Sequence, residues 1–357
     1  MKFIYMCALV AVVVLSFGFI DPNFPYQPFP EYFTYLHSQR LVSTTIYVAT
    51  ICVMFGFYLK VLVDVRRNRI KPSQVWQLIL LSVVILFFSY PAVFTYDIFN
   101  YIATAKVTYL YHQNPYLVMP IEIPNEPMLA YMHAANKVAL YGGFWIFLTA
   151  IPHVLGLGNI ILTLATFKLF IVLFYFLLLK QLINLSDNKI WTLAFFGLNP
   201  LILLETVVSA HNDVVMMFFA VFSFALLRKK RYFLSIIFFV LSVCIKYSTI
   251  LLLPLILKKS MNWRYAAIFM YIAFLLSPLR EELYAWYFIW VLPFVALIPE
   301  SQLLVNISFA FSFGLMFRIA PYLYTWRWDG ITPIVKRIVS FVPPAFVALW
   351  YGFRKKN

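Results

Sequence analysis

The sequence predicts an all-α polytopic membrane protein of about twelve transmembrane or partly crossing helices, with interfacial helices in the outer loops. Of the 357 residues, 64% are hydrophobic and only 11% are charged, whereas a soluble domain has roughly 25% charged residues. The mean hydropathy is +0.87. The net charge of +15 comes from basic residues scattered between apolar runs, which is typical of membrane topology and not of nucleic-acid binding.

The apolar runs define the predicted spans. The first, residues 1–20, has no small-residue cleavage site, so we interpret it as a span and not as a signal peptide. Further runs lie near 41–63, 75–95, 159–182, 190–209, 213–228, 232–245, 247–258, 263–279, 286–299, 302–320 and 337–353. Several are shorter than the ~20 residues that a perpendicular span needs. Basic residues flank 232–258 on both sides, which predicts a short hairpin that only partly crosses.

The charges predict the orientation. With the N-terminus inside, the basic runs at 66–71, 228–231 and 354–356 all fall on the cytoplasmic side, together with both termini. The acids sort to the other side: Asp21, Glu31, Asp97, Glu122, Glu126, Asp213, Glu281, Glu282 and Asp329. We therefore expect a multi-pass protein of the cell (plasma) membrane whose active site lies on the outer face.

Two long segments belong to that outer face of a single integral-membrane domain, 1–357. Residues 21–40 are rich in proline and aromatic residues, as expected of a strip on the lipid surface. Residues 96–158 are too polar to cross as a whole. Both are expected to carry interfacial helices.

The motifs of soluble enzymes are absent. The sequence has no GxGxxG, GxxxxGK[ST], GxSxG or HExxH motif, and its three cysteines lie inside apolar runs without ligand spacing. We therefore predict no cofactor, no metal and no nucleic-acid partner. Ionisable residues near the ends of spans remain as candidates, because charges at membrane depth are expensive and are retained for function.

Asp97 is the first candidate. On a helix that starts there, Asp97, Asn100, Tyr101 and Thr104 share one face. The functional hypothesis is a general base that takes a proton from an attacking hydroxyl. The alternative is that Asp97 only caps a helix and favours its dipole. Further polar residues follow in the same segment: His112, Asn114 and Tyr116.

The stretch NPLILLETVVSAHND, residues 199–213, is the second candidate. Asn199-Pro200 predicts a kinked span, with Glu205 in its outer part. His211, Asn212 and Asp213 then reach the outer surface, where we expect hydrogen bonds to a phosphate or sugar. Glu205 as a contact within the helix bundle, and His211 with Asp213 as a metal pair, are the alternatives.

Two lysines and one arginine are candidate cations. Lys246 lies between short apolar runs and is either a snorkelling lysine or a grip for a lipid phosphate. Lys168 falls at mid-membrane, where an ammonium needs a partner or a polar cavity. Arg280 opens the mouth of a later span and suits phosphate oxygens, which guanidinium groups bind bidentately. Trp286 and Tyr287 beside it suit a sugar ring or an aromatic belt.

Five blocks of the chain also resemble a known family. YDIFNYIATAK with HQNPY, YGGFWI, NPLILLE with AHND, IKYSTILLLP and YAWYFIWVLPF follow one another between about residue 90 and residue 295. They resemble blocks of bacterial GT-C fold glycosyltransferases that use polyprenyl-phosphate sugars, above all the polyprenol-phosphate-mannose-dependent α-mannosyltransferases. The resemblance implies a helical membrane bundle with an outward-facing site and a lipid-borne sugar donor.

The resemblance also implies roles for individual residues. Asp97 matches the family's catalytic acid residue. The other matched positions are Asn114, Pro115 and Tyr116, then His211, Asn212 and Asp213, then Lys246 and Tyr247, and finally Trp286 and Tyr287. Gly143, Ala285 and the pair Ser248-Thr249 depart from the family pattern, which leaves the sugar and the acceptor open.

These observations combine in one expected reaction. Arg280 and Lys246 hold the phosphate of a polyprenyl-phosphate hexose, which the resemblance implies is mannose. Asp97 deprotonates the hydroxyl of a lipid- or glycan-borne acceptor, with inversion at the sugar. Two other classes stay open: a transporter or flippase of lipid-linked sugars, which predicts substrate contacts near Lys168, and a non-catalytic subunit or a glycan ligase or polymerase.

Overall fold

The computed structural model describes residues 2–91, 94–279 and 282–354, and these contain helices and loops without a strand. Its α-helices are α1 (Lys2–Phe17), α2 (Pro30–Ser38), α3 (Arg40–Arg66), α4 (Pro72–Phe87), α5 (Asp97–Ala105), α6 (Gly143–Leu155), α7 (Ile160–Leu185), α8 (Lys189–Gly197), α9 (Pro200–Leu203), α10 (Asp213–Arg228), α11 (Tyr232–Val243), α12 (Leu253–Leu257), α13 (Trp263–Leu276), α14 (Leu292–Ala296), α15 (Gln302–Met316), α16 (Ala320–Thr325) and α17 (Thr332–Arg354). The predicted all-helical class is confirmed.

Shorter helical turns connect these helices. Two are π-helical, η2 (Lys106–Leu110) and η5 (Leu204–Val208). The others are 3₁₀ turns: η3 (Pro120–Glu122), η4 (Pro127–Ala130), η6 (Tyr247–Leu252), η7 (Ser277–Leu279), η8 (Ala285–Trp290) and η9 (Phe317–Ile319).

The apolar helices make a membrane protein plausible, but only part of the expected spans have full length. Four described helical stretches are long and apolar enough to cross: Arg40–Arg66, Ile160–Leu185, Gln302–Thr325 and Thr332–Arg354. A bent pair, Lys189–Gly197 with Pro200–Val208, makes a fifth if it counts as one span. The run at 286–299 is not one helix, because η8 and the five-residue α14 divide it. The total of about twelve stays a prediction.

Helix α10 is buried on almost every side and packs against α7, α11 and η8. Helix α1 packs against α3 and α4, where Tyr5 and Ser82 share a buried hydrogen bond of 2.7 Å. The α11 to α12 segment forms the expected hairpin of short helices, of which α11 has only 12 residues.

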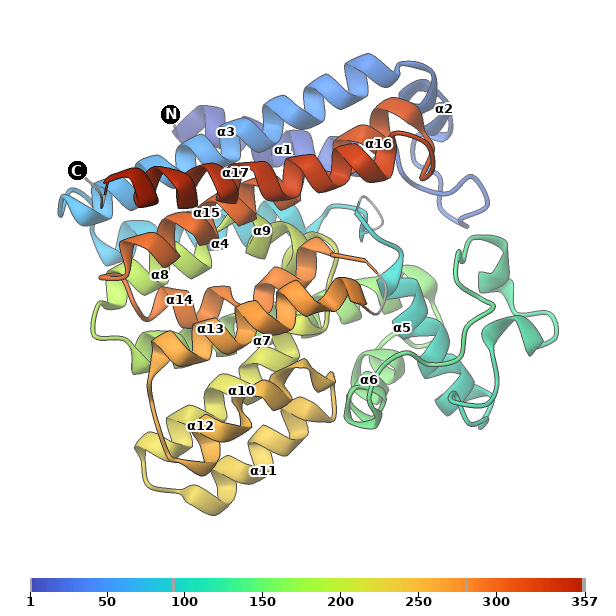
Figure 1. Ribbon diagram of the computed structural model, residues 1–357. Helices are drawn as coiled ribbons and strands as arrows, with labels where there is room; N and C mark the ends of the chain where they lie inside the picture. Colours follow the sequence, from blue (N-terminus) through green and yellow to red (C-terminus); the bar gives the residue numbers. More distant parts are fainter. Residues whose placement is uncertain (1, 92–93, 280–281, 355–357) are drawn as a thin grey trace.

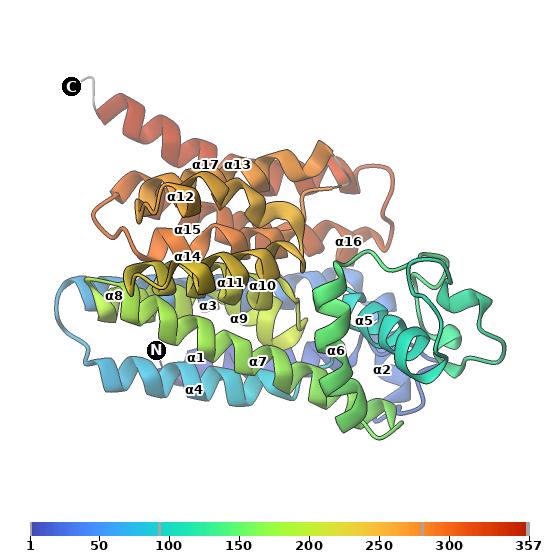
Figure 2. The same cartoon turned by 90° about the horizontal axis from the view of Figure 1, so that it is seen from below.

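Different segments lie at the two ends of the bundle (Figure 1). The start of α1, the end of α17 and the basic connection between α3 and α4 lie at one end, whereas α2, α5, α6 and α16 lie at the other. The view turned by 90° shows the same division (Figure 2). Asp97, the first residue of α5, therefore lies at the end of the bundle opposite both termini.

Asparagine side chains begin several helices. Asn159, Asn188, Asn199 and Asn262 each accept a hydrogen bond from a backbone N–H in the first turn of the following helix. Such caps satisfy donors that have no partner within the helix. The predicted kink at Asn199-Pro200 is confirmed, since Lys189–Gly197 and Pro200–Val208 differ in direction by 57°.

Candidate active site

Asp97 begins α5 and lies over a buried histidine. Its carboxylate is in the first turn, where the helix dipole favours negative charge, but the N-cap residue is Tyr96, so only the dipole part of the capping interpretation fits. The carboxylate also meets a second group, because Oδ2 lies 3.8 Å from Nδ1 of His211. The Asp97 side chain is 25% exposed, whereas His211 is fully buried. Asp97 is thus the exposed end of a polar cluster that continues inward.

His211 connects two carboxylates. Its Nε2 lies 3.2 Å from Oε2 of Glu205, on the side away from Asp97. Its ring stacks on Trp286 with the centroids 4.2 Å apart, and Trp286 stacks in turn on Tyr284. Burial lowers the pKa of His211 well below its usual value, and the positive charge of Lys246 lowers it further. Burial therefore favours the neutral imidazole, which has one donor and one acceptor nitrogen.

Local backbone geometry turns these side chains toward each other. Glu205 belongs to the π-helical turn η5, and such turns frequently occur at functional sites. The backbone N–H of His211 donates to the carbonyl of Glu205 at 3.0 Å. Between them, Ala210 adopts a left-handed conformation with φ of 57°, which is unfavourable for a residue other than glycine. The strained turn places His211 directly against Glu205.

Asp213 organises a second cluster beside the first. One carboxylate oxygen accepts a hydrogen bond from Nζ of Lys246 at 2.7 Å, and the other accepts one from Nε1 of Trp290 at 2.6 Å. Nζ of Lys246 also lies 5.5 Å from the ring centroid of Tyr287. Asp213 is fully buried, while the Lys246 side chain is 16% exposed. Lys246 is thus oriented by Asp213 and keeps further N–H donors for a ligand.

A close contact between two loops forms one wall of the site. The backbone N–H groups of Gly142 and Phe144 donate to the carbonyls of Ile245 and Cys244, at 3.1 and 3.2 Å. A Cβ atom on Gly142 would lie 2.0 Å from the carbonyl oxygen of Cys244. Only glycine allows this approach. The contact fixes the residue before Lys246 against the start of α6.

Tyr101 and Asn100 face inward. Tyr101 is fully buried against Tyr141 and Trp145, and its hydroxyl accepts a 3.4 Å hydrogen bond from the backbone N–H of Asn212. Helix α5 is buried on most of its surface, so Tyr101 and Thr104 of the predicted polar face pack into the protein. Tyr101 supports the loop that carries His211.

Buried polar atoms without a hydrogen-bond partner concentrate around this loop. Within the described ranges they include side-chain atoms of Asn100, Glu205, Ser209, His211 and Asn212. Native proteins pair nearly all buried polar groups, so such a cluster is a typical place for a ligand or for ordered water. The same region contains the carboxylate and the cation described above.

Some candidates lie outside these contacts. Asn114 is exposed, and its side chain accepts a 3.0 Å hydrogen bond from the backbone N–H of Tyr116. Tyr116 reaches the wall, because its hydroxyl donates to the carbonyl of Tyr141 at 2.9 Å. Tyr247 is 72% exposed. Arg280 lies outside the described residues.

Lys168 has a partner within the bundle. Its Nζ donates to the backbone carbonyl of Ser89 at 2.6 Å, just after the end of α4. A cation is favourable at a helix C-terminus, where carbonyl groups lack partners. Lys168 is 3% exposed and lies under the ring of Phe87. This arrangement explains the buried charge without a substrate.

Sequence reasoning missed three residues of the site. Trp290 donates to Asp213, Tyr141 packs on Tyr101, and Ser209 lies buried in the strained turn. Burial raises the pKa of the Tyr141 phenol and the Asp97 charge raises it further. Tyr141 and Trp290 lie in the blocks YGGFWI and YAWYFIW, which were the only signal for them.

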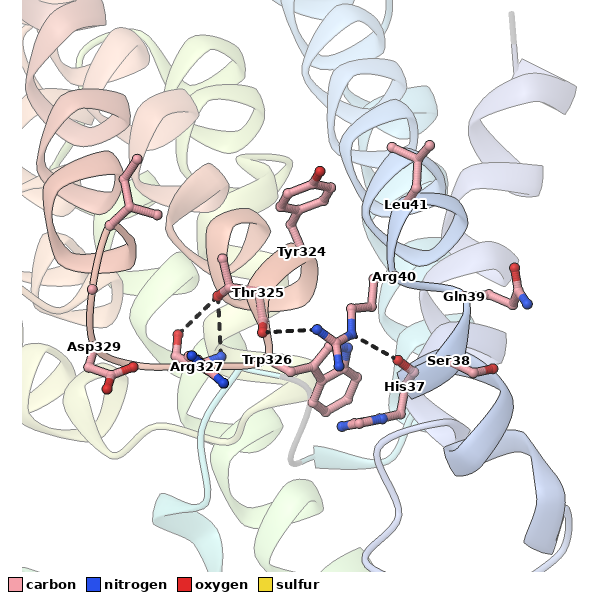
Figure 3. Close-up of a pocket in the computed structure, with 12 residues that line it drawn as sticks. His37, Ser38, Gln39, Arg40, Leu41, Tyr324, Thr325, Trp326, Arg327 and Asp329 are labelled. Atoms are coloured by element: carbon pink, nitrogen blue, oxygen red, sulfur yellow. Dashed lines mark hydrogen bonds between the residues drawn. The ribbon is translucent and has the colours of Figure 1, made fainter.

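A hollow of about 900 Å³ lies elsewhere, between the start of α3 and the segment that joins α16 to α17 (Figure 3). In the described part of the chain, no group of three His, Cys, Asp or Glu residues lies close enough to hold a metal ion.

Comparison with known proteins gives one match. Residues 4–262 match the family model of the alpha-(1→6)-mannopyranosyltransferase N-terminal domain. No curated protein and no solved structure matches the chain. The match covers more than half of the chain, and it includes Asp97, Glu205, His211, Asp213 and Lys246.

Proposed function

Because the chain belongs to the alpha-(1→6)-mannopyranosyltransferase family and is a mannosyltransferase, we propose that it takes mannose from a polyprenyl-phosphate donor. The acceptor is a hydroxyl of a lipid- or glycan-borne chain on the outer face of the plasma membrane, and transfer inverts the anomeric carbon. Asp97 is the general base. The observation that carries this proposal is the 3.8 Å approach of the exposed Asp97 carboxylate to the buried His211.

Asp97 has the position that a base requires. A general base must be within hydrogen-bond reach of the proton that it takes, and its other contacts must hold it in place. Asp97 is open to the outside on one side and faces His211 on the other. Nδ1 of His211 faces this carboxylate at 3.8 Å, and stacking on Trp286 fixes the imidazole ring.

Lys246 is the cation for the leaving phosphate. Asp213 holds its ammonium with one hydrogen bond, and two N–H donors remain for phosphate oxygens. Arg280, which the sequence assigns to the same role, would add a bidentate grip. The aromatic rings of Trp286 and Tyr287 lie beside the two clusters and suit the apolar face of a sugar.

The bonds of the reaction balance without another reactant. The acceptor hydroxyl gives its proton to the Asp97 carboxylate while its oxygen forms a bond to the anomeric carbon. The bond from that carbon to the donor phosphate oxygen breaks, and polyprenyl phosphate leaves with the electron pair. Positive charge at Lys246 stabilises the negative charge that develops on this oxygen.

The charge distribution supports an outer site and a lipid-borne donor. Asp97 lies at the end of the bundle opposite both termini and the basic α3–α4 connection. Under the positive-inside rule this is the external end. An outer site lies away from the nucleotide sugars of the cytoplasm, which favours a donor that reaches the site through the membrane.

A transfer assay tests the proposal. The purified protein in detergent receives radiolabelled polyprenyl-phosphate mannose and an α-mannosyl acceptor, and GDP-mannose serves as the alternative donor. We expect product from the lipid donor alone. Product from GDP-mannose alone would overturn the lipid donor, and unchanged transfer by Asp97→Asn would overturn the base. Movement of the intact lipid-linked sugar across vesicles, without transfer, would favour a flippase.

A further inference from the structure

The hollow between α3 and the α16–α17 segment contains two arginines. Arg40 begins α3, and Arg327 follows α16 (Figure 3). Neither guanidinium forms an ion pair in the described ranges. Arg40 donates only to the carbonyls of His37 and Thr325, at 3.3 and 3.4 Å. Asp329 is the one carboxylate among the described residues that line the hollow.

The walls of this hollow are structured. Trp326 adopts a left-handed conformation with φ of 53°, which is strained for an aromatic residue. Its ring centroid lies 4.6 Å from that of His37, and its buried Nε1 has no hydrogen-bond partner in the described part of the chain. Strain of this kind persists only where surrounding contacts hold it. The hollow is therefore a defined feature and not a loose gap.

The rim of the hollow is apolar. Leu41, Tyr324 and Ile331 are exposed by 68%, 57% and 63%. Ile331 begins an exposed strip that continues along α17 through Ile334, Ile338 and Val342, spaced so that they share one helix face. Only 11% of the apolar window of α17 is buried within the protein. A hydrocarbon chain fits along this strip.

The position matches the level of lipid headgroups. Both α3 and α17 are long enough to cross a membrane, and the hollow lies where both begin. Arginine and tryptophan are common at this level, where guanidinium groups reach phosphates. A free anion would explain the arginines but not the apolar strip. A bare glycan would explain the aromatic rings but not two arginines that form no ion pair with the described residues.

We infer that this hollow binds the phosphate headgroup of an anionic lipid, with Arg40 and Arg327 on the phosphate and a hydrocarbon chain along α17. The site shares no residue with the cluster around Asp97. Its second wall, residues 324–331, lies beyond the segment that matches the family model. The inference is therefore independent of the proposed transfer reaction.

A lipid-binding measurement tests the inference. The full-length protein in detergent is titrated with palmitoyl-oleoyl phosphatidylglycerol, and bound lipid is counted by native mass spectrometry. Glycerol phosphate supplies the headgroup without chains, and dioleoylglycerol supplies chains without phosphate. We expect binding of phosphatidylglycerol that Arg40→Gln with Arg327→Gln weakens about tenfold or more.

Matched controls separate this site from general charge effects. Arg67→Gln with Arg69→Gln removes the same charge from exposed positions at the opposite end and should leave binding unchanged. Asp97→Asn should also leave it unchanged. If the double variant unfolds, Arg327→Gln alone serves as the test, because the Arg327 guanidinium forms no hydrogen bond or ion pair with a described residue.

Three outcomes would overturn the inference. Equal binding by the double variant and the wild type removes the two arginines as ligands. Equal binding of glycerol phosphate shows an anion site without lipid, and equal binding of dioleoylglycerol shows an apolar surface without a headgroup site.

Discussion

Nδ1 of His211 lies 3.8 Å from Oδ2 of Asp97, although one residue follows a π-helical turn and the other begins a helix in a distant outer segment. Their approach places the partly exposed Asp97 carboxylate next to buried polar side chains. In the proposed reaction this pairing holds the base still while its exposed side receives a proton. The relationship makes separate predictions for the two residues.

Replacing Asp97 with Asn should lower kcat by about 10²-fold to 10⁴-fold, because the amide cannot accept the proton. The KM for the donor should change little, since the phosphate grip lies at Lys246. Initial rates at varied donor concentration measure both. Glu31→Gln, an exposed acid in the first turn of α2, is the matched control and should retain full activity.

Replacing His211 with Gln should lower kcat by up to ~10²-fold, because Asp97 loses its orienting contact. The wild-type rate should show no histidine transition near pH ~6.5, since burial lowers the pKa of His211 well below that value. A pH–rate profile checks this. If the wild-type rate changes with pH near that value and the variant rate does not, the result would contradict a neutral His211.

Replacing Lys246 with Gln should lower kcat/KM by about 10²-fold to 10³-fold, as expected when one group that stabilises the leaving oxygen is removed. Lys246→Arg should recover part of the rate. Lys180→Gln removes an exposed lysine on α7 and serves as the control. Recovery by arginine separates a charge requirement from a packing defect; equal loss in both variants would count against the phosphate role.

Gly142→Ala should destabilise the protein by about 1–3 kcal/mol, because the new Cβ would lie 2.0 Å from the Cys244 carbonyl. Gly143→Ala is the neighbouring control, since its Cβ would meet only the Tyr116 hydroxyl, at 3.6 Å. Thermal unfolding in detergent compares the two. A smaller loss at Gly142 than at Gly143 would contradict the close loop contact.

Glu126 should make stability depend on acid pH. Burial alone would raise its pKa, but hydrogen bonds from Lys106, Tyr111 and the backbone of Met128 bring the pKa below its usual value. A lowered folded pKa gives stability that is present above the unfolded value of ~4.3 and is lost as the pH falls through the folded value. The Tm of Glu126→Gln should therefore differ from wild type at pH ~7 and approach it in acid. If the Tm difference between the two proteins stayed constant across this pH range, Glu126 would not be the source of the pH dependence.

The sequence by itself determined the helical class and the kink at Asn199-Pro200, and it predicted a membrane protein whose acids are separated from its basic runs. These features follow from composition and from local chemistry, because apolar runs form helices in lipid and proline breaks the hydrogen-bond ladder. The chain segments that contain Asp97, His211, Asp213 and Lys246 were also identified from the sequence.

The tertiary structure alone decided which of these residues meet. In the folded protein His211 lies between Asp97 and Glu205. Asp213 accepts hydrogen bonds from Lys246 and Trp290. Lys168 donates a hydrogen bond to the carbonyl of Ser89. The tertiary structure also turned Tyr101 inward and brought Arg40 and Arg327 to one hollow. Such contacts join residues far apart in the chain, and their distances depend on how helices pack, which no local pattern records.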